Sequence, residues 1–362
     1  GYSRLDRSVC SLGLLAGSLF QRSLEQARRL EIGLAARGYN GELRVVTQER
    51  SLSWPRLAVA MAFVALIGLG GRFAGSRRVT TTPLLAVRGL DYRYPCGVAA
   101  LRDLNLSVER GCKLAILGPN GSGKTTLLLH LNGTFRPTRG EVLLDGCLAS
   151  YDRRFLNHWR RRVGLVLQEP DDQLFAATVG QDVSFGPLNL GLSAVETSER
   201  VREALELLRI THLADRATHS LSFGQKKRVA IAGVLAMQPE ILVLDEPTSG
   251  LDARGVTHLL GALQQLHEAG TTLVFSTHDV ELAYAWADQV VLFYDGTVLR
   301  QGETAAVLAD REVMSRARLL PPLLLELAQL LRDDDGDAEW RLPRSREVVL
   351  ALLRERLQDG GS

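Results

Sequence analysis

The chain has 362 residues, of which 46% are hydrophobic and 23% charged, and it carries a formal net charge of +2. This length gives room for two or three domains. The near-neutral charge gives no reason to expect nucleic acid as a partner, because such binding needs concentrated positive charge. The cysteines are scattered without metal-ligand or redox spacing, which fits a reduced cytosolic compartment, and they are Cys10, Cys96, Cys112 and Cys147.

The first predicted element is a basic amphipathic helix near the amino terminus. Its apolar positions at helical spacing are Leu19, Leu24, Ala27, Leu30 and Leu34, and its basic positions are Arg22, Arg28, Arg29 and Arg37. The stretch 11–46, with Ala36-Arg37-Gly38 at the helix end, resembles a coupling helix of the transmembrane T subunit of energy-coupling-factor transporters, particularly the cobalt type. In that family the arginine reaches into a groove of the ATPase and transmits its movement. An ordinary charged surface helix is the alternative.

An apolar segment follows at 57–71, uncharged over 15 residues between Arg56 and Arg72. At about 1.5 Å per residue it spans roughly 23 Å, less than a hydrocarbon core of about 30 Å, although flanking residues and snorkelling arginines allow a thin crossing. The T-subunit resemblance implies a final membrane helix here.

A full crossing would conflict with that resemblance, because a nine-residue linker at 75–83 would then place the rest of the chain outside. Either the segment does not cross fully, or the fusion has another arrangement, or the chain is a fragment or a misjoined product. The missing initiator Met and the absence of further membrane helices favour a fragment of a longer fusion protein.

The sequence GPNGSGKTT at 118–126 matches the phosphate-loop pattern, follows the strand-like run Lys113–Leu117 and opens the helical segment Thr125–Leu131. Its glycines can adopt backbone angles closed to other residues, which turns successive N–H groups toward one anion. Lys124 is expected to reach the outer phosphates of ATP, and the Thr125 hydroxyl to bind Mg²⁺. A solvated glycine-rich turn is the alternative. The predicted nucleotide-binding residues here are Gly118, Pro119, Asn120, Gly121, Ser122, Gly123, Lys124, Thr125 and Thr126.

A helix is predicted after about residue 193, with Ser193 or Thr197 as its cap. Its apolar positions at helical spacing are Val201, Ala204, Leu205 and Leu208. The sequence LSFGQ at 221–225 precedes a second helical run, KKRVAIAGVLAM. With the phosphate loop, this run resembles the signature motif and helix of the ATP-binding-cassette (ABC) family.

The signature resemblance has a consequence for stoichiometry. Ser222 stands at an N-cap position and Gly224 permits close approach, so the helix start forms a second anion site. In the family this site faces the γ-phosphate held by the opposite protomer. The resemblance therefore implies that Ser222, Gly224 and Gln225 contact nucleotide on a partner, and that one chain must pair to hydrolyse ATP.

The apolar run Ile241–Leu244 is typical of a strand buried on both faces of a parallel sheet. It delivers Asp245 and Glu246 to the carboxyl end of that strand, where open α/β sheets bind ligands. Asp245 is expected to hold Mg²⁺ through water, and Glu246 to polarise the attacking water. Two solvated carboxylates at a strand end are the alternative.

Four further positions carry roles only through the family resemblance. Gln168 resembles the Q-loop glutamine, which touches Mg²⁺ and reports nucleotide state to the membrane subunit, and the following EPDDQLF resembles the energy-coupling-factor form. Asp252 ends a D-loop-like run that crosses the dimer seam in the family. His278 resembles the switch histidine, which contacts the γ-phosphate and positions the water. Tyr94 resembles the adenine-stacking aromatic, with Tyr92 as the alternative.

After about residue 311, two amphipathic helices are predicted on either side of the acidic run DDDGD at 333–337. A proline pair before a leucine-rich helix resembles the C-terminal extension of energy-coupling-factor ATPases, which helps to hold two cassettes together. Packing of this segment against its own domain is the alternative.

The resemblances imply an α/β phosphate-loop NTPase cassette at 84–310, with a RecA-like parallel sheet core, an antiparallel β subdomain and a helical signature subdomain. A helical, membrane-associated T-subunit fragment at 1–80 would precede it, and a helical extension at 311–362 would follow it.

The expected function is ATP hydrolysis that energises an energy-coupling-factor importer, with ATP and Mg²⁺ bound. Cobalt ion is the expected cargo and nickel the second choice. Expected partners are a second, identical or different, ATPase subunit and integral membrane T and substrate-binding subunits, at the cytoplasmic face of a bacterial or archaeal cell membrane. The alternatives are the nucleotide-binding subunit of another ABC transporter, such as an exporter, and a soluble ABC ATPase that acts mechanically on a macromolecule.

Overall fold

The computed structural model describes residues 27–37, 39, 82–331 and 342–359, with side chains described through 355 in the last range. The apolar segment 57–71 and the acidic run 333–337, both singled out above, lie outside the described residues. Within the described ranges, none of the helices combines the length and the apolar character needed to span a bilayer.

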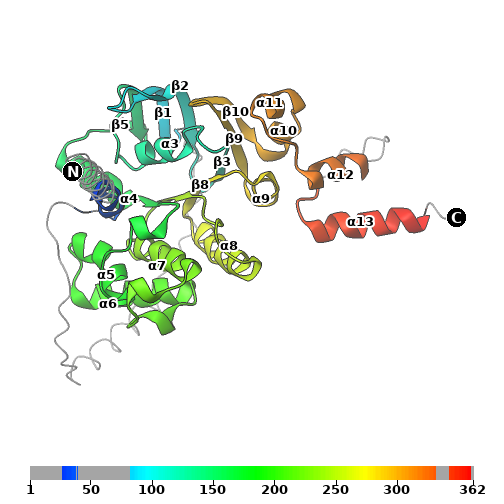
Figure 1. Ribbon diagram of the computed structural model, residues 1–362. Helices are drawn as coiled ribbons and strands as arrows, with labels where there is room; N and C mark the ends of the chain where they lie inside the picture. Colours follow the sequence, from blue (N-terminus) through cyan, green and yellow to red (C-terminus); the bar gives the residue numbers. More distant parts are fainter. Residues whose placement is uncertain (1–26, 38, 40–81, 332–341, 360–362) are drawn as a thin grey trace, which may run out of the picture.

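Two sheets form the frame of the cassette (Figure 1). The four-stranded sheet is antiparallel in the order β2-β1-β4-β5, with bounds Leu85–Arg93 for β1, Ala99–Val108 for β2, Arg139–Leu144 for β4 and Cys147–Leu148 for β5. The six-stranded sheet has the order β10-β9-β3-β8-β7-β6 and is parallel except for β10. Its bounds are Lys113–Leu117 for β3, Val163–Val166 for β6, Ile241–Asp245 for β7, Thr272–Thr277 for β8, Gln289–Tyr294 for β9 and Thr297–Glu303 for β10.

The helices of the cassette lie between and after the strands in the sequence. Their bounds are Lys124–Leu131 for α3, Arg153–Arg162 for α4, Val179–Asn189 for α5, Ala194–Leu207 for α6, Phe223–Leu235 for α7, Ala253–Glu268 for α8 and Val280–Trp286 for α9. Short 3₁₀ turns occupy Pro170–Asp172, Thr211–Leu213 and Thr218–Ser220. Helices α5, α6 and α7 form a separate helical lobe beside the sheets (Figure 1). The parallel core, the antiparallel subdomain and the helical subdomain predicted from the sequence are thus all present.

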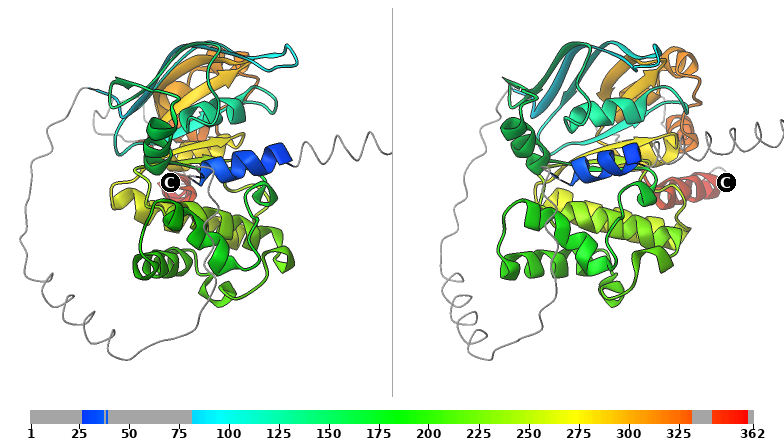
Figure 2. Two further views of the ribbon diagram at one scale, coloured as in Figure 1. Left: turned by 90° about the vertical axis from the view of Figure 1, so that its left-hand side faces the viewer. Right: turned by 60° about the vertical axis from the view of Figure 1, so that its left-hand side comes forward.

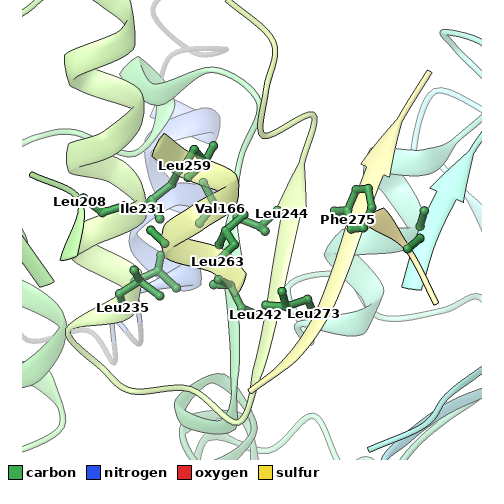
Figure 3. Packing of buried hydrophobic residues seen from close by; sticks show 14 of the residues in the cluster. Val166, Leu208, Ile231, Leu235, Leu242, Leu244, Leu259, Leu263, Leu273 and Phe275 are labelled. Carbon is green, nitrogen blue, oxygen red and sulfur yellow. The ribbon is translucent and has the colours of Figure 1, made fainter. Parts of the chain in front are cut away.

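The core lies against the faces of the parallel sheet. Every residue of β7 and β8 is buried, and for β7 the apolar run at 241–244 predicts this burial on both faces. Leucines from these strands pack against α7 and α8 (Figure 3). The residues labelled there are Val166, Leu208, Ile231, Leu235, Leu242, Leu244, Leu259, Leu263, Leu273 and Phe275. This packing holds the carboxyl ends of β3, β7 and β8 side by side.

Local capping sets where the helices of the lobe begin. Ser193 caps α6 in a reciprocal capping box with Glu196, whereas Thr197 is buried inside the helix. Ser222 caps α7 in the same way with Gln225. Of the two predicted caps for α6, the structure therefore selects Ser193.

The amino-terminal helix, described over residues 27–36, lies between the sheets and the helical lobe (Figure 2). A Cβ atom on Gly33 would sit 2.1 Å from the carbonyl oxygen of Asp172, so the backbones of this helix and of the Q-loop approach too closely for any side chain there. Arg29 lies 3.7 Å from the carboxylate of Asp172. The predicted amphipathic helix is thus present and docked on its own cassette.

The cassette ends with α10 (Thr304–Leu308), and the carboxyl-terminal extension contains α11 (Arg311–Arg316), α12 (Leu323–Leu331) and α13 (Arg346–Asp359). Leu325 of α12 joins the main buried cluster and Ala328 is fully buried, and Tyr284 of α9 donates a hydrogen bond to the carbonyl of Pro343 at 3.0 Å. The extension therefore packs against its own domain, while Leu320 and Leu330 stay 82% and 76% exposed.

Candidate functional site

The loop between β3 and α3 brings its backbone close to β9 and to the antiparallel sheet. A Cβ on Gly118 would lie 2.2 Å from the carbonyl oxygen of Phe293, so this glycine is required by packing. Gly121 and Gly123 instead adopt φ values of 78° and 104°, in the left-handed region that side chains disfavour. The sequence analysis explained all three glycines by their backbone angles. This explanation holds for Gly121 and Gly123, whereas Gly118 is required by close packing.

Lys124 and Ser122 give this loop its phosphate-binding chemistry. The Nζ atom of Lys124 donates to the carbonyls of Gly118 at 2.8 Å and Pro119 at 3.2 Å. Burial lowers the pKa of Lys124, and the carboxylates of Glu246 and Asp245 partly oppose that shift. The buried hydroxyl of Ser122 has no hydrogen-bond partner within the described part of the chain. A buried unpaired donor beside a buried cation fits an anionic phosphate group.

Asp245 stands at the carboxyl end of β7 and is held from two sides. The Thr125 hydroxyl donates to its Oδ2 at 2.6 Å, and the Ser276 hydroxyl donates to its Oδ1 at 2.5 Å. Carboxylate and hydroxyl oxygens are hard ligands of the kind that Mg²⁺ prefers. The predicted metal-binding pair Thr125 and Asp245 is therefore in contact, and its donor chemistry fits that ion.

Glu246 has a strained backbone and a side chain with specific partners. Its φ of 45° is unusual for a residue other than glycine, and such strain is concentrated at functional sites. The N–H of Glu246 donates to the hydroxyl of Ser276 at 3.0 Å. The Nδ1 atom of His278 lies 3.1 Å from each carboxylate oxygen. Lys124 lies 3.8 Å away. The carboxylate is thus oriented by a histidine and paired with a buried cation.

A cavity of about 380 Å³ joins these groups. Tyr94 lines it, and its hydroxyl lies 2.8 Å from that of Thr126. Tyr92 is instead packed on Phe135 with ring centroids 5.2 Å apart, so the structure favours Tyr94 over Tyr92 as the aromatic at the nucleotide. The lining residues are Tyr94, Val98, Ala99, Ala100, Asn120, Gly121, Ser122, Gly123, Lys124, Thr125, Thr126, Gln168, Asp245, Glu246, Asp295 and Gly296.

The signature and D-loop residues lie together but do not line that cavity. Ser222 and Gln225 form the capping box of α7, and Asp252 caps α8 by accepting from the N–H of Gly255 at 2.7 Å. A Cβ on Gly250 would lie 2.3 Å from the ring of Phe223, so the D-loop is pressed against the signature. A Cβ on Gly224 would lie 3.3 Å from Leu251. The predicted site residues thus fall into two separate groups on one chain.

Two residues that contact the predicted site residues were not identified from the sequence: Ser276 and Lys227. Ser276 connects Asp245 and Glu246 from the neighbouring strand, as described above. Lys227, on α7, is fully buried, and its Nζ donates to the carbonyls of Gln168 at 2.6 Å and Glu246 at 3.1 Å. Burial lowers the pKa of Lys227 to about 8, against the opposing pull of Asp245, Glu169 and Glu246. A lysine inside an otherwise apolar helical face was the signal in the sequence.

Arg37 lies in the groove between the Q-loop and the helical lobe. Its side chain is fully buried and forms an ion pair with the buried carboxylate of Asp182 on α5. Its guanidinium lies over the ring of Phe175, 5.7 Å from the centroid. On the other side, a Cβ on Gly233 would lie 2.9 Å from the Arg37 guanidinium carbon. The groove therefore accepts this arginine because position 233 has no side chain.

Comparisons with known proteins agree with this geometry. Residues 101–249 match the ABC transporter family, and residues 1–48 match the family described as cobalt transport protein. The chain is 59% identical, over 75% of its own length and 98% of the relative's, to the cobalt import ATP-binding protein CbiO of Rhodobacter capsulatus. It is 47% identical to the energy-coupling factor transporter ATP-binding protein EcfA of Methanocaldococcus jannaschii, over 75% of this chain and 99% of the relative.

Two solved structures are also similar. One is cbiO1 from Clostridium perfringens, part of the ABC transporter complex cbiONQ, with 43% identity, a TM-score of 0.58, and coverage of 68% of this chain and 99% of that chain. The other is a dimeric ATP-binding cassette in a post-hydrolysis state with ADP and Pi, with 30% identity, a TM-score of 0.57, and coverage of 61% and 98%. The chain therefore belongs to the ABC transporter ATPases, in the branch of the cobalt and energy-coupling-factor importers, and hydrolyses ATP in support of transport.

Proposed function

We propose that this chain energises the import of cobalt ion, with nickel as the second choice, and that it carries the end of its own T subunit. The observation that carries the proposal is the buried Arg37–Asp182 ion pair. It joins a segment similar to a cobalt transport protein to a cassette similar to a cobalt import ATPase. The cassette would work at the cytoplasmic face of a bacterial or archaeal cell membrane, with integral membrane T and substrate-binding subunits.

In the proposed reaction, the phosphate loop and Lys124 hold the phosphates of ATP beside Tyr94. Glu246 accepts a proton from the attacking water, and His278 orients that carboxylate. Thr125, Asp245 and Gln168 would hold Mg²⁺, which supplies a Lewis acid that offsets phosphate charge. Ser222, Gly224, Gln225 and Asp252 lie away from this cavity, so they would act on nucleotide bound by a second cassette. Each reaction centre would thus contain residues from two chains.

The docked helix would connect this pair to the membrane. A buried charge that loses its partner costs about 3–5 kcal/mol, so the Arg37–Asp182 pair resists separation. Movement of the helical lobe on ATP closure would therefore carry the amino-terminal helix with it. The second choice of function, a cassette of another transporter such as an exporter, would leave Arg37 without a role in coupling.

The test measures metal uptake by cells that express the full-length gene with its membrane subunits. We expect uptake of Co²⁺ that exceeds that of Ni²⁺ and is abolished by Glu246→Gln. We expect Arg37→Ala to lower uptake at least about tenfold while ATP binding persists, because one buried pair exceeds the 1.4 kcal/mol that a tenfold change requires. Arg28→Ala, an exposed arginine of the same helix, is the matched control.

Each alternative predicts a different result. Greater uptake of Ni²⁺ than of Co²⁺ would identify nickel as the cargo. Extrusion of metal instead of uptake would indicate an exporter. Normal uptake by Arg37→Ala would remove the coupling role of that helix. If the protein failed to co-purify with small integral membrane subunits, the mechanical ATPase alternative would gain support.

A further inference from the structure

Lys227 connects three parts of the catalytic machinery through a single buried ammonium group. It lies on α7, two residues after the signature, and its side chain is fully buried. Its Nζ donates to the backbone carbonyl of Gln168 in the Q-loop at 2.6 Å and to that of Glu246 after β7 at 3.1 Å. Those carbonyls belong to residues 59 and 19 positions away in the chain. The contact therefore exists only in the folded cassette.

Burying an ammonium group is costly unless its hydrogens are bonded. Carboxylate charge surrounds this one, from Asp245 at the end of β7, from Glu246 just after it and from Glu169 in the Q-loop. The direct partners of Nζ, however, are carbonyl oxygens of two peptide groups rather than carboxylate oxygens. The two hydrogen bonds therefore hold the backbone at Gln168 and Glu246 in place. The negative charge of the carboxylates offsets the cost of burying the ammonium group.

The two peptide groups need such a restraint. Glu246 has a φ of 45°, which costs free energy and persists only where surrounding contacts enforce it. Its carbonyl also accepts from the N–H of Ser249 at 3.2 Å, and its N–H donates to Ser276. Gln168 follows β6 in a loop and lines the nucleotide cavity. Through the two carbonyls, Lys227 links the backbone at Glu246 to the backbone at Gln168.

We propose that Lys227 is a positioning residue for ATP hydrolysis, which ties the Q-loop and the catalytic glutamate to the signature helix through two backbone hydrogen bonds. The same helix begins at Ser222 and passes Arg37 at Gly233. A shift of α7 is therefore transmitted directly to both carbonyls. The inference rests on the ATPase activity of the family and not on the cargo or on the amino-terminal helix.

The test compares two substitutions that differ only in hydrogen-bonding capacity. Lys227→Met keeps an unbranched chain of similar length but has no donor, whereas Lys227→Gln is neutral and keeps an amide donor. The matched control is Arg202→Met. Arg202, on α6, is 54% exposed and pairs with Glu206 one turn further along the same helix, and such surface pairs contribute little.

For the full chain, kcat is measured per nucleotide-binding molecule, and Kd is measured by titration with a fluorescent ATP analogue. We expect Lys227→Met to lower kcat between about tenfold and a hundredfold, since small misplacements of catalytic groups have effects of this size. The Kd of Lys227→Met should stay within about threefold of wild type, and Lys227→Gln should give a kcat between those of Lys227→Met and wild type. The control variant should stay within about twofold of wild type in both kcat and Kd.

Three results would overturn the proposal. The first is an unchanged kcat in Lys227→Met, and the second is a Kd that weakens in parallel with kcat. The third is equal kcat in the Met and Gln variants, because charge alone would then matter. If Lys227→Met does not fold, Lys227→Gln decides: reduced kcat at unchanged Kd supports the role, and wild-type kcat rejects it. If both variants fail to fold, Lys227 serves the stability of the whole cassette and the proposal is wrong.

Discussion

In the proposed reaction, Glu246 is the residue on which the chemistry of hydrolysis depends most directly. Its carboxylate is nearly buried, 3.8 Å from Lys124 and 3.1 Å from His278, so both its charge and its orientation are specified. Removal of a general base costs on the order of 10²–10⁴ in rate, while phosphate binding relies on other groups.

We therefore expect Glu246→Gln to bind ATP with nearly wild-type affinity, to accumulate as a closed pair and to lose at least about a hundredfold in kcat. Equilibrium binding, size-exclusion chromatography with ATP and a steady-state phosphate assay check the three parts. Asp288→Asn, at a carboxylate 46% exposed and outside the nucleotide cavity, serves as the control. Hydrolysis at the normal rate by Glu246→Gln would exclude this residue as the base.

His130 offers a test of burial at the single-residue level. It is fully buried on α3, its Nδ1 lies 2.7 Å from the carbonyl of Thr126, and its ring meets Tyr92 edge-on at 4.6 Å. Burial lowers the pKa of His130 from its usual 6.5 to about 4, because the charged imidazolium is poorly solvated there.

Between these two pKa values the unfolded chain binds a proton that the folded chain does not. The contribution of His130 to the free energy of unfolding therefore has its full value above about pH 6.5, and it decreases as the pH falls toward 4. For this one group the expected loss is about 2 kcal/mol between pH 7.5 and pH 5. Urea titrations at both pH values compare wild type with His130→Gln, in which the loss should be smaller by that amount. An identical pH dependence in both proteins would contradict the shift.

At the scale of elements, α7 makes room for Arg37 through one missing side chain. Gly233 would normally weaken a helix by about 0.5–1 kcal/mol relative to alanine. Here it leaves the space that the Arg37 guanidinium occupies, 2.9 Å from where a Cβ would lie. Gly261 of α8 provides the contrast, since nothing lies within 4 Å of its Cβ position.

We expect Gly233→Ala to displace the amino-terminal helix from the groove while the cassette remains folded. Hydrogen exchange in the peptide 27–37 should accelerate at least about tenfold, which corresponds to 1.4 kcal/mol of lost protection. Gly261→Ala should leave that exchange unchanged and raise the free energy of unfolding by about 0.5–1 kcal/mol. Equal exchange in Gly233→Ala and wild type would show that the contact does not hold the helix.

At the scale of the whole molecule, the predicted site residues of one chain lie in two separate groups. The phosphate loop and the Asp245–Glu246 pair share one cavity, whereas Ser222 and Asp252 lie outside it. Two chains placed face to face would bring the signature of each to the phosphate loop of the other. A mixing experiment can distinguish this arrangement from a self-sufficient chain.

Lys124→Ala removes the phosphate-loop cation but keeps the signature, and Ser222→Arg blocks the signature but keeps the phosphate loop. Each variant alone should lose at least about a hundredfold in ATPase rate. When the two are mixed, the mixed pair contains one complete centre, so activity should return. If no activity returns, or if wild-type chains stay fully active at dilutions where they are single, the two-chain centre is wrong. Mixing Lys124→Ala with Glu246→Gln is the control, because neither chain then has a working phosphate loop and base together.

Much of the cassette was predictable because its signals are local. The strands β3 and β7 appear as short apolar runs, and the phosphate loop places its strand, turn and helix within consecutive residues. Where the sequence left two candidates, the structure separated them by their contacts: Ser193 rather than Thr197 caps α6, and Tyr94 rather than Tyr92 lines the nucleotide cavity. Gly118 is explained by the Phe293 carbonyl, which belongs to a strand far along the chain.

The sequence by itself determined the chemistry of this protein, because the hydrogen-bonding groups and charges of each motif lie within a few consecutive residues. Tertiary structure alone decided which distant groups meet. Thr125 contacts Asp245 across 120 residues, and Arg37 contacts Asp182 across 145. Lys227 likewise became a candidate only when packing of α7 placed it between two carbonyls. The physical reason is that such contacts depend on how whole layers pack together, and no local pattern of residues specifies that packing.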